Sequence, residues 1–422
     1  MAARGRSKAM KEGRWAAVVA IGSRLLLAAV AVLTTLTIGV SSRALSLRDP
    51  LHTEVLAGFA KRLFEPWAHW DGVWFVRIAA DGYAAHEFSP AFFPLYPLLL
   101  RAVAPFTGGN HVIAGVVVSL ICYAGAMVLL YRLANAELGA PIALWSVVFI
   151  SVFPVALVFQ AVYSESLFLL LGLACFAAAR RGHWLLAGVM GLLATLTRSS
   201  GLVLLVPLAV MWWEQRQALP LRLPGGPAGG RVPARRPAIA TLAFLLLVPA
   251  GLALYMTYLW RTFGDPLLFG VVQGNWGRGL AAPWTAVWNG TVEGVRGIGW
   301  LVMHGPGEIL GTRNDSGGIP LEILANVAEF AGLVAAALLL AACWRKLPAA
   351  YTAYAVAALL FPLFYPAAGR PLSSLPRFVL VDFPLFIGLA AVLVPHRVAR
   401  WVAAGGMLAL LVVATVYFAS WS

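Results

Sequence analysis

Apolar runs long enough to cross a membrane recur along most of this chain, and they limit its possible folds more than any other feature. A helix needs about 20 predominantly apolar residues to span the hydrocarbon core of a bilayer. Of the 422 residues, 61% are hydrophobic and 11% are charged, whereas soluble domains average roughly 45–50% apolar and about 25% charged residues. The composition therefore excludes a water-soluble globular protein and predicts a single polytopic membrane domain.

Basic residues lie mainly in the short segments between these apolar runs. The chain has 31 Lys and Arg against 17 Asp and Glu, a formal net charge of +14. In a soluble protein such an excess would suggest nucleic acid as a partner, but basic loops are typical of the cytoplasmic side of membrane proteins. We therefore expect membrane lipids, and no nucleic acid, as partners. The cytoplasmic markers are the basic tail of residues 1–22, Arg180 with Arg181, the Gly/Pro/Arg linker 214–236, Arg345 with Lys346, and Arg397 with Arg400.

The apolar runs predict an all-α, polytopic integral membrane domain over residues 23–422. In lipid every backbone polar group needs a partner within the protein, which favours helices. A segment that joins two cytoplasmic markers must cross an even number of times, and this parity gives about eleven transmembrane helices with the carboxyl end outside. The expected spans are residues 23–41, 111–133, 141–160, 164–180, a broken pair at 183–197 and 201–213, then 237–260, 320–343, 349–365, 376–394 and 401–419.

Two long segments, residues 42–110 and 261–319, lie outside the membrane on this interpretation. The first contains an apolar run, residues 91–106, that is too short and too rich in proline to span, and we expect it to be re-entrant or interfacial. The second contains a Trp-bearing stretch, residues 284–302, that is typical of an interfacial helix. The first outer loop is therefore expected to carry short interfacial helices.

No motif in the sequence predicts a metal or an organic cofactor. The three cysteines, Cys122, Cys175 and Cys343, lie within apolar runs and have neither CxxC nor Cys/His spacing. The sequence has no Walker loop, no dinucleotide fingerprint and no HExxH zinc motif. We therefore expect no cofactor, and ATP-driven transport by this chain is not predicted.

Acidic residues concentrate in the first outer loop. Six of the 17 lie there: Asp49, Glu54, Glu65, Asp71, Asp81 and Glu87. The densest stretch, His69-Trp70-Asp71-Gly72-Val73-Trp74, is followed by Tyr83 and Tyr96. Aromatic rings beside one acid at a membrane surface predict a wall for a sugar, with the carboxylate reaching a hydroxyl group. The alternative is an interfacial loop whose rings lie among headgroups and whose Asp71 caps a short helix.

Three further charged residues interrupt the apolar runs. Glu165, at the start of a predicted span, either stabilises that helix end or faces a polar cavity. Arg198 is a candidate ligand for a lipid phosphate, or it pairs with Glu165 or Asp382 to hold helices together. Arg377 can complete an anion site together with Arg370, or extend its side chain to the headgroups.

Six pieces of the chain occur in the order found in one known family: residues 69–74 (HWDGVW), 82–83 (GY), 91–97 (AFFPLYP), 163–166 (YSES), 197–201 (TRSSG) and 376–378 (PRF). Together they resemble the GPI mannosyltransferase family that adds the second mannose, within the GT-C glycosyltransferase superfamily. The chain is similar to a bacterial-type homologue, and the resemblance covers about residues 65–395. Its Ala/Arg/Gly/Val-rich composition is typical of a high-GC bacterium, in which no GPI anchor is expected, so the acceptor stays open.

This resemblance implies a GT-C-like mannosyltransferase of the bacterial plasma membrane with its active site on the extracytoplasmic face. It implies transfer of mannose, with inversion and without a metal, from a polyprenyl phosphate donor to a lipid-linked or surface glycan acceptor. Asp71 carries over as the essential acid and would act as the base. Arg198 and Arg377 would bind the donor phosphate. The expected substrate-binding residues are His69, Trp70, Trp74, Tyr83, Tyr96 and Glu165.

Two other functions fit a membrane chain with buried arginines. A flippase or exporter of lipid-linked sugars would move its substrate without making a glycosidic bond. A non-catalytic membrane subunit would stabilise a partner transferase. No internal repeat is evident in the sequence, which weighs against a transporter built from two related halves.

Overall fold

The computed structural model describes residues 2–38, 56–84, 87–217, 237–311 and 321–420. The acids Asp49 and Glu54 and residues 218–236 of the linker lie outside these ranges. Within them the regular structure is helical, and the described residues contain no strand beyond one isolated antiparallel bridge between Arg278 and Ala367. The predicted all-α fold is therefore confirmed.

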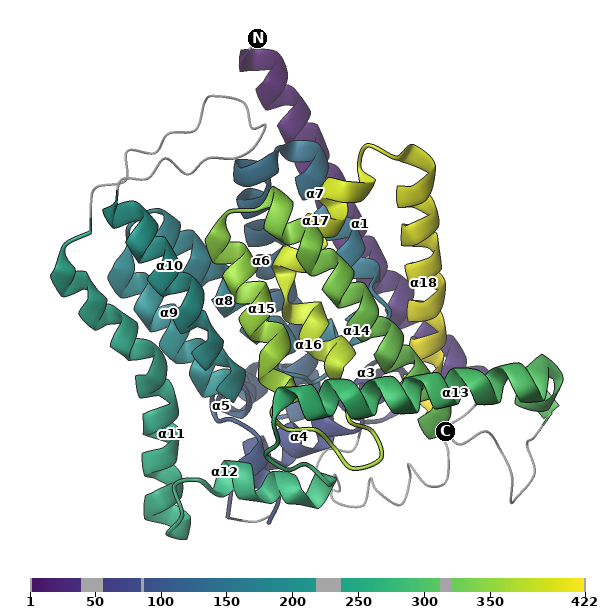
Figure 1. The fold of residues 1–422 in the computed structure, drawn as a ribbon. Coiled ribbons are helices and arrows are strands. Elements are labelled where there is room, and N and C mark those ends of the chain that lie inside the picture. The colour runs from purple at the N-terminus through teal and green to yellow at the C-terminus, as the bar shows by residue number, and fades with distance from the viewer. Residues whose placement is uncertain (1, 39–55, 85–86, 218–236, 312–320, 421–422) are drawn as a thin grey trace.

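The long helices form an upright bundle (Figure 1). Each predicted span is helical over most of its described length. The first helix begins earlier than predicted, because it continues back through the basic tail to Ala2. The helices that match the spans are α1 (Ala2–Thr37), α6 (His111–Leu138), α7 (Ala140–Val152), α8 (Glu165–Arg180), α9 (Trp184–Thr197), α10 (Leu205–Arg216), α11 (Leu247–Phe263), α14 (Leu321–Lys346), α15 (Ala349–Leu363), α16 (Leu375–Val381), α17 (Phe383–Leu393) and α18 (Arg397–Ser420).

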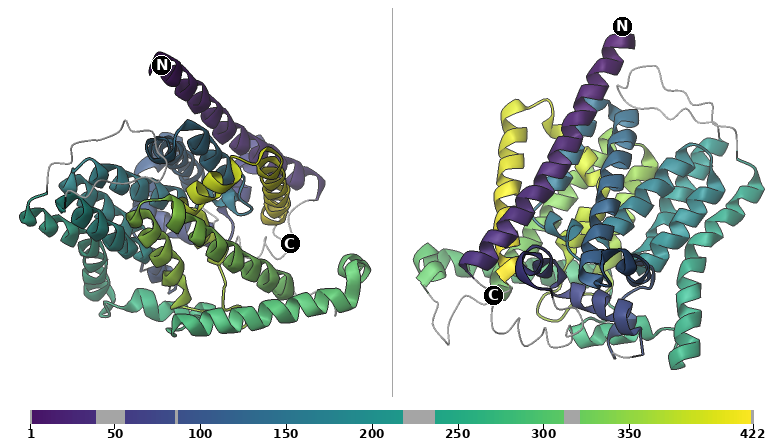
Figure 2. Two further views of the ribbon diagram at one scale, coloured as in Figure 1. Left: turned by 45° about the horizontal axis from the view of Figure 1, so that its top comes forward. Right: turned by 180° about the vertical axis from the view of Figure 1, so that it is seen from behind.

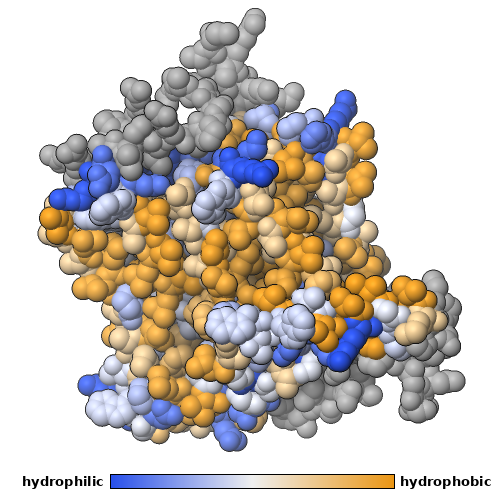
Figure 3. Space-filling view, viewed as in Figure 1, coloured by the Kyte–Doolittle hydropathy of each residue, from blue (hydrophilic) through white to orange (hydrophobic). Residues whose placement is uncertain are grey.

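Among the described residues, five helices are long and apolar enough to cross a membrane on their own. They are α1 from Glu12, α6, the continuous stretch Ile239–Phe263 that ends in α11, α14 from Ile323, and α18. The pair α16 and α17, bent by 75°, makes a sixth if it counts as one broken span. Figure 3 shows a broad hydrophobic band across the middle of one face, with hydrophilic residues above and below it. The chain is thus polytopic by length and composition, while the count of eleven spans stays a prediction.

Short helices of residues 58–107 gather at the lower end of the bundle in Figure 1. They are α3 (Gly58–Phe64), η2 (Glu65–Ala68), α4 (Asp71–Asp81), η3 (Ser89–Ala91), α5 (Leu95–Val103) and η4 (Ala104–Thr107). With nine residues, α5 is too short to span a bilayer, as expected for residues 91–106. Arg101 Nε donates to Ala79 O at 2.6 Å and so joins α5 to the last turn of α4.

Helix α13 (Pro283–Gly311) lies across the lower end of the bundle (Figures 1 and 2). Its Trp284 and Trp288 are exposed by 73% and 70%. On another face Gly294 meets α14 so closely that a Cβ at this position would lie 2.5 Å from Phe330 Cβ. The helix therefore packs on the bundle along one side and presents tryptophans on the other, which is the arrangement expected of an interfacial helix over residues 284–302.

Arg24 shows how the bundle tolerates a break inside a predicted span. The residue lies within α1 and is 6% exposed. Its Nη1 donates to Ala156 O at 2.6 Å and its Nη2 donates to Ser151 O at 2.8 Å. Because α7 ends at Val152, the carbonyl groups of its last turn lack helical donors. Arg24 supplies donors there, and the span predicted over residues 141–160 can bend instead of continuing as one helix.

Replacing Arg24 by Leu removes these donors while making α1 more apolar. We expect the free energy of unfolding to fall by about 3 kcal/mol, because a hydrogen bond to a charged group contributes about 1.5–3 kcal/mol. Thermal unfolding of the purified protein in one detergent measures the change. Arg14→Leu, at an exposed position of the same helix, is the matched control and should leave the melting temperature unchanged. A stabilised Arg24→Leu variant would show that the two carbonyl bonds contribute nothing.

Candidate active site

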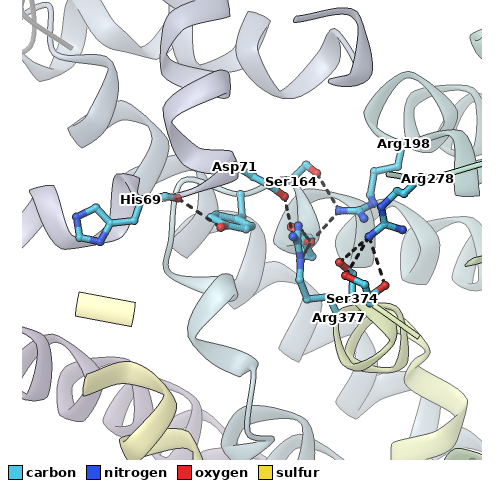
Figure 4. Close-up of polar contacts among 10 residues, drawn as sticks. His69, Asp71, Ser164, Arg198, Arg278, Ser374 and Arg377 are labelled. Carbon is cyan, nitrogen blue, oxygen red and sulfur yellow. Dashed lines mark hydrogen bonds and ion pairs between the residues drawn. The ribbon is translucent and has the colours of Figure 1, made fainter. Parts of the chain in front are cut away.

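Four charged side chains from distant parts of the chain meet at one place, and Figure 4 labels three of them, Asp71, Arg198 and Arg377. Arg377 Nη1 donates to Asp71 Oδ2 at 2.6 Å, although 306 residues separate the two. Arg377 Nε donates to Glu165 Oε1 at 2.8 Å. Arg198 Nη1 donates to the same oxygen, also at 2.8 Å. We call these four residues, which the sequence predicted as site residues, the charge cluster.

Three members of the charge cluster lie at helix ends that favour their charge. Asp71 and Glu165 are the first residues of α4 and α8, where the positive end of the helix dipole stabilises a carboxylate. Arg198 directly follows α9, whose carboxyl end favours a cation. The local sequence thus places each charge where its own helix stabilises it, and helix packing brings these ends to one point. Trp70 precedes α4 and Ser164 precedes α8, and neither side chain makes a capping hydrogen bond.

Two backbone positions beside the charge cluster adopt a conformation that residues other than glycine avoid. Trp70, with φ 59°, and Ser374, with φ 69°, are the only non-glycine residues of the described chain with positive φ. Trp70 directly precedes the helix that carries Asp71, and Ser374 directly precedes the helix that carries Arg377. Such strain persists only where surrounding contacts impose it, and it concentrates at functional sites.

The two carboxylates of the charge cluster differ in exposure. The side chain of Glu165 is 1% exposed, whereas that of Asp71 is 35% exposed. One oxygen of Glu165 accepts hydrogen bonds from both arginines, and the Arg377 guanidinium lies 4.7 Å from the centre of the Tyr163 ring. Glu165 is therefore an enclosed anchor for two cations, while the Asp71 carboxylate is accessible to a ligand.

The structure shows which carboxylates pair with the predicted arginines. Arg198 pairs with Glu165, whereas Asp382 is buried and its carboxylate has no hydrogen-bond partner among the described residues. Arg377 turns into the cluster because two carboxylates bind it, and the alternative that it extends to the headgroups is wrong.

Arg278 was not predicted, yet it lies beside the charge cluster (Figure 4). Its Nη2 donates to Ser374 Oγ at 3.1 Å and to Ser373 O at 3.3 Å. No carboxylate of the described chain lies within ion-pair distance of this guanidinium, so its charge is not neutralised directly. Burial lowers the pKa of Arg278, and the negative charge of Asp71 opposes that change.

Arg370, and not Arg278, was the expected companion of Arg377. Arg370 instead pairs with Glu329 of α14. Arg278 reaches the site because its segment pairs with the one before α16, as the hydrogen bond from Ala368 N to Gly277 O at 2.9 Å shows. The local signal was weak, because Arg278 lies between two glycines in a segment that was only predicted to lie outside the membrane. Only the pairing of the two distant segments identifies it.

Two of the predicted aromatic residues present rings near the accessible acid. Trp74 follows Asp71 by one turn of α4, and its ring stacks on that of Phe92 with centroids 5.9 Å apart. The Trp74 ring also packs edge-on against Trp276, at 6.4 Å. Trp70 is 44% exposed. The exposed ring of Trp70 provides an apolar face of the kind on which a sugar can stack, whereas the Trp74 ring is covered by Phe92 and by the Arg77 guanidinium, 4.9 Å from its centre.

The other predicted aromatic residues lie in the core rather than at the charge cluster. Tyr83 donates its hydroxyl to Phe92 O at 2.7 Å, and burial raises its pKa, so it stays protonated. Tyr96 is fully buried and donates to Gly115 O at 3.1 Å. His69 is buried with Nδ1 2.9 Å from Phe418 O. The structure thus does not bring these three residues to the cluster. Within the described residues, no group of His, Cys, Asp and Glu is arranged to hold a metal ion.

The difference in exposure predicts different costs for removing the two carboxylates. Glu165→Gln should lower the free energy of unfolding by about 3–5 kcal/mol, because it breaks a buried ion pair and leaves two arginines facing each other. Asp71→Asn should cost about 1 kcal/mol or less, as is usual for a more exposed pair. Thermal unfolding of both variants in the same detergent measures the difference. Equal losses would contradict the assignment of Glu165 as the anchor.

Comparison with known proteins found similar solved structures. Three similar solved structures come from Archaeoglobus fulgidus. The first is an oligosaccharyltransferase tethered with an acceptor peptide. The match covers 82% of this chain and 50% of the oligosaccharyltransferase chain, with 12% identity and a TM-score of 0.39. The complex of that enzyme with Zn and sulfate covers 84% and 49%, with 13% identity and a TM-score of 0.39. The oligosaccharyltransferase AglB with an inhibitory peptide and a dolichol-phosphate covers 84% and 51%, with 12% identity and a TM-score of 0.35. The chain thus spans about half the length of these structures.

Sequence comparison is more specific. No curated protein matches the chain. Residues 16–214, however, match the model of a family described as mannosyltransferase (PIG-V). The matched residues include Asp71, Glu165 and Arg198 of the charge cluster. This match confirms the resemblance drawn from the ordered motifs. The part of the chain that carries these three residues is therefore similar to the PIG-V mannosyltransferase family.

Proposed function

We propose that this multi-pass membrane protein moves mannose from a polyprenyl phosphate donor to a lipid-linked or surface glycan acceptor, with inversion. The observation that carries the proposal is the accessible carboxylate of Asp71 held beside a group of arginines. This combination supplies a proton acceptor and an anion site at one place. The reaction needs both, because a hydroxyl group must lose a proton while a phosphate leaves with growing negative charge.

The charge balance of the site favours a phosphate. Within the described part of the chain, Arg198, Arg278 and Arg377 face two carboxylates, Asp71 and Glu165, so these five groups carry one net positive charge when all are ionised. Arginine binds phosphate oxygens through charge-assisted and often paired hydrogen bonds. The excess charge resides on Arg278, whose bonds all go to neutral oxygen atoms.

In the proposed mechanism Asp71 accepts the proton of the acceptor hydroxyl as its oxygen attacks the anomeric carbon of the mannose. The bond from that carbon to the phosphate oxygen breaks in the same step, and the polyprenyl phosphate leaves. Arg198, Arg278 and Arg377 stabilise the negative charge that develops on it. Glu165 is committed to two arginines, so it is not available as a nucleophile for a double displacement. One displacement inverts the configuration.

The substrate roles of the aromatic residues follow their exposure. Trp70 would contact the sugar with its exposed ring face, and Trp74, stacked on Phe92, would support the aromatic residues beside it. His69, Tyr83 and Tyr96 would act through packing, because their polar atoms bind groups of the protein itself. His69 in particular holds the turn before Asp71 against the end of α18.

We place the site on the extracytoplasmic face of a bacterial plasma membrane, with about eleven spans. The basic amino-terminal end of α1 lies at the end of the bundle opposite to α4 and α13 (Figure 1). Basic segments next to spans favour the cytoplasmic side, which supports an outer position for the charge cluster.

Asp71→Asn should abolish transfer while the protein stays folded. Loss of a general base lowers the rate by about 100-fold to 10,000-fold. The assay uses purified protein, radiolabelled polyprenyl phosphate mannose and a membrane lipid extract as the acceptor source. Asp81→Asn, at the exposed far end of the same helix, is the matched control and should stay active. An active Asp71→Asn enzyme would contradict the assigned base, and donor movement across vesicles without a new glycosidic bond would indicate a flippase.

Arg278→Gln should weaken the use of the donor, because it removes the net positive charge from the phosphate site. We expect kcat/KM for the donor to fall by about 10-fold to 100-fold, since a hydrogen bond to a charged group contributes about 1.5–3 kcal/mol. Initial rates at varied donor concentration measure the effect. Arg296→Gln, which removes an exposed cation paired with Glu293 on α13, should not change this value. An unchanged kcat/KM in Arg278→Gln would exclude Arg278 from the phosphate site.

A further inference from the structure

A cavity of about 390 Å³ opens near the aromatic residues that surround Trp74. It lies between the loop after α4 and the segment that follows α11, which contains α12 (Leu268–Val271) and η8 (Val272–Trp276). Ligand pockets in proteins measure about 300–1,000 Å³, so the volume suits a small ligand. None of the predicted phosphate ligands lines this cavity.

The lining of the cavity is amphipathic. Its polar residues include Glu87 and Asn275, and its apolar wall includes Leu268 and Val271. Val271 is 63% exposed, so the apolar side is open to the surroundings. Tyr83 contributes its ring, since its hydroxyl is bound to Phe92 O. A carboxylate and an amide together accept and donate hydrogen bonds, which matches the hydroxyl groups of a sugar.

The charge of the cavity distinguishes it from the phosphate site. Among the described residues of its lining, Glu87 is the only charged one, and a carboxylate repels a phosphate. The charge cluster, with its excess of arginine, attracts one. The charge cluster therefore favours an anionic ligand, and the cavity favours a neutral one.

A cluster of aromatic rings connects the cavity with Asp71. Phe88 and Trp276 directly follow the lining residues Glu87 and Asn275 in the chain. Their ring centroids lie 5.9 Å apart, and both rings contact Trp74, at 5.8 and 6.4 Å. Since Trp74 follows Asp71 by one helical turn, a sugar that leaves the cavity along these rings reaches the accessible carboxylate.

We propose that this cavity binds the neutral sugar end of a glycolipid acceptor, while the donor phosphate occupies the arginine site. The inference rests on the proposed transfer reaction, because it names the place of the second substrate. The ligand class is an amphiphile with an uncharged, hydroxyl-rich headgroup and an apolar chain. Glu87 and Asn275 bind its hydroxyl groups, and the wall around Val271 contacts its chain.

Protection of an introduced cysteine tests the proposal without any transfer reaction. The native cysteines are all buried, so Val271→Cys provides an accessible thiol at the cavity. The full chain in zwitterionic nanodiscs is labelled with a maleimide in the presence of octyl glucoside or octyl phosphate, which share one chain and differ in headgroup charge. Val302→Cys, at a position of α13 that is 78% exposed, is the matched control.

Saturable protection of Val271→Cys by octyl glucoside, and not by octyl phosphate, is the expected result. Adding Glu87→Gln should raise the half-protecting concentration about tenfold, because a hydrogen bond to a charged group is lost. Equal or better protection by octyl phosphate, no protection by octyl glucoside, or equal protection of Val302→Cys would overturn the proposal. Because binding is measured directly, these outcomes are independent of whether the chain transfers mannose.

Discussion

The candidate site depends on the carboxylate of Glu165. One oxygen of this enclosed side chain accepts hydrogen bonds from Arg198, after α9, and from Arg377, on α16. Two guanidinium groups at this spacing repel each other, and a buried charge without a partner is costly. Glu165 offsets both costs. It thereby fixes Arg377 where another of its nitrogen atoms meets Asp71, and the ends of α4, α8, α9 and α16 share one point.

The same principle organises polar groups elsewhere in the bundle. Arg24 binds the carbonyl groups left free where α7 ends, and Glu137 pairs with Arg180 at the far end of α8. Asp382 differs, since its carboxylate is buried without a hydrogen-bond partner among the described residues, at the 75° bend between α16 and α17. That bend separates α16, which carries Arg377, from α17.

Sequence reasoning found the helices and three of the four members of the charge cluster for one physical reason. Apolar runs in a membrane must satisfy their own backbone, so helices follow from hydropathy, as α6 and α14 show. A charge within such a run is costly and therefore conspicuous, which is why Glu165, Arg198 and Arg377 could be selected. Arg278 was not selected because charged residues are common in segments that are predicted to lie outside the membrane. The short breaks after α7 and at Asp382 were not predicted, because the sequence on both sides of each break is apolar.

The sequence by itself determined that the chain is helical and polytopic, which residues could carry charge into its interior, and through ordered motifs which family it resembles. It could not determine the partners of those charges, because an ion pair depends on where helix ends meet. Only the tertiary structure decided that Glu165 anchors two arginines while Asp71 stays accessible, and that Arg278 joins them from a distant segment. These assignments depend on packing across hundreds of residues, which no local pattern encodes.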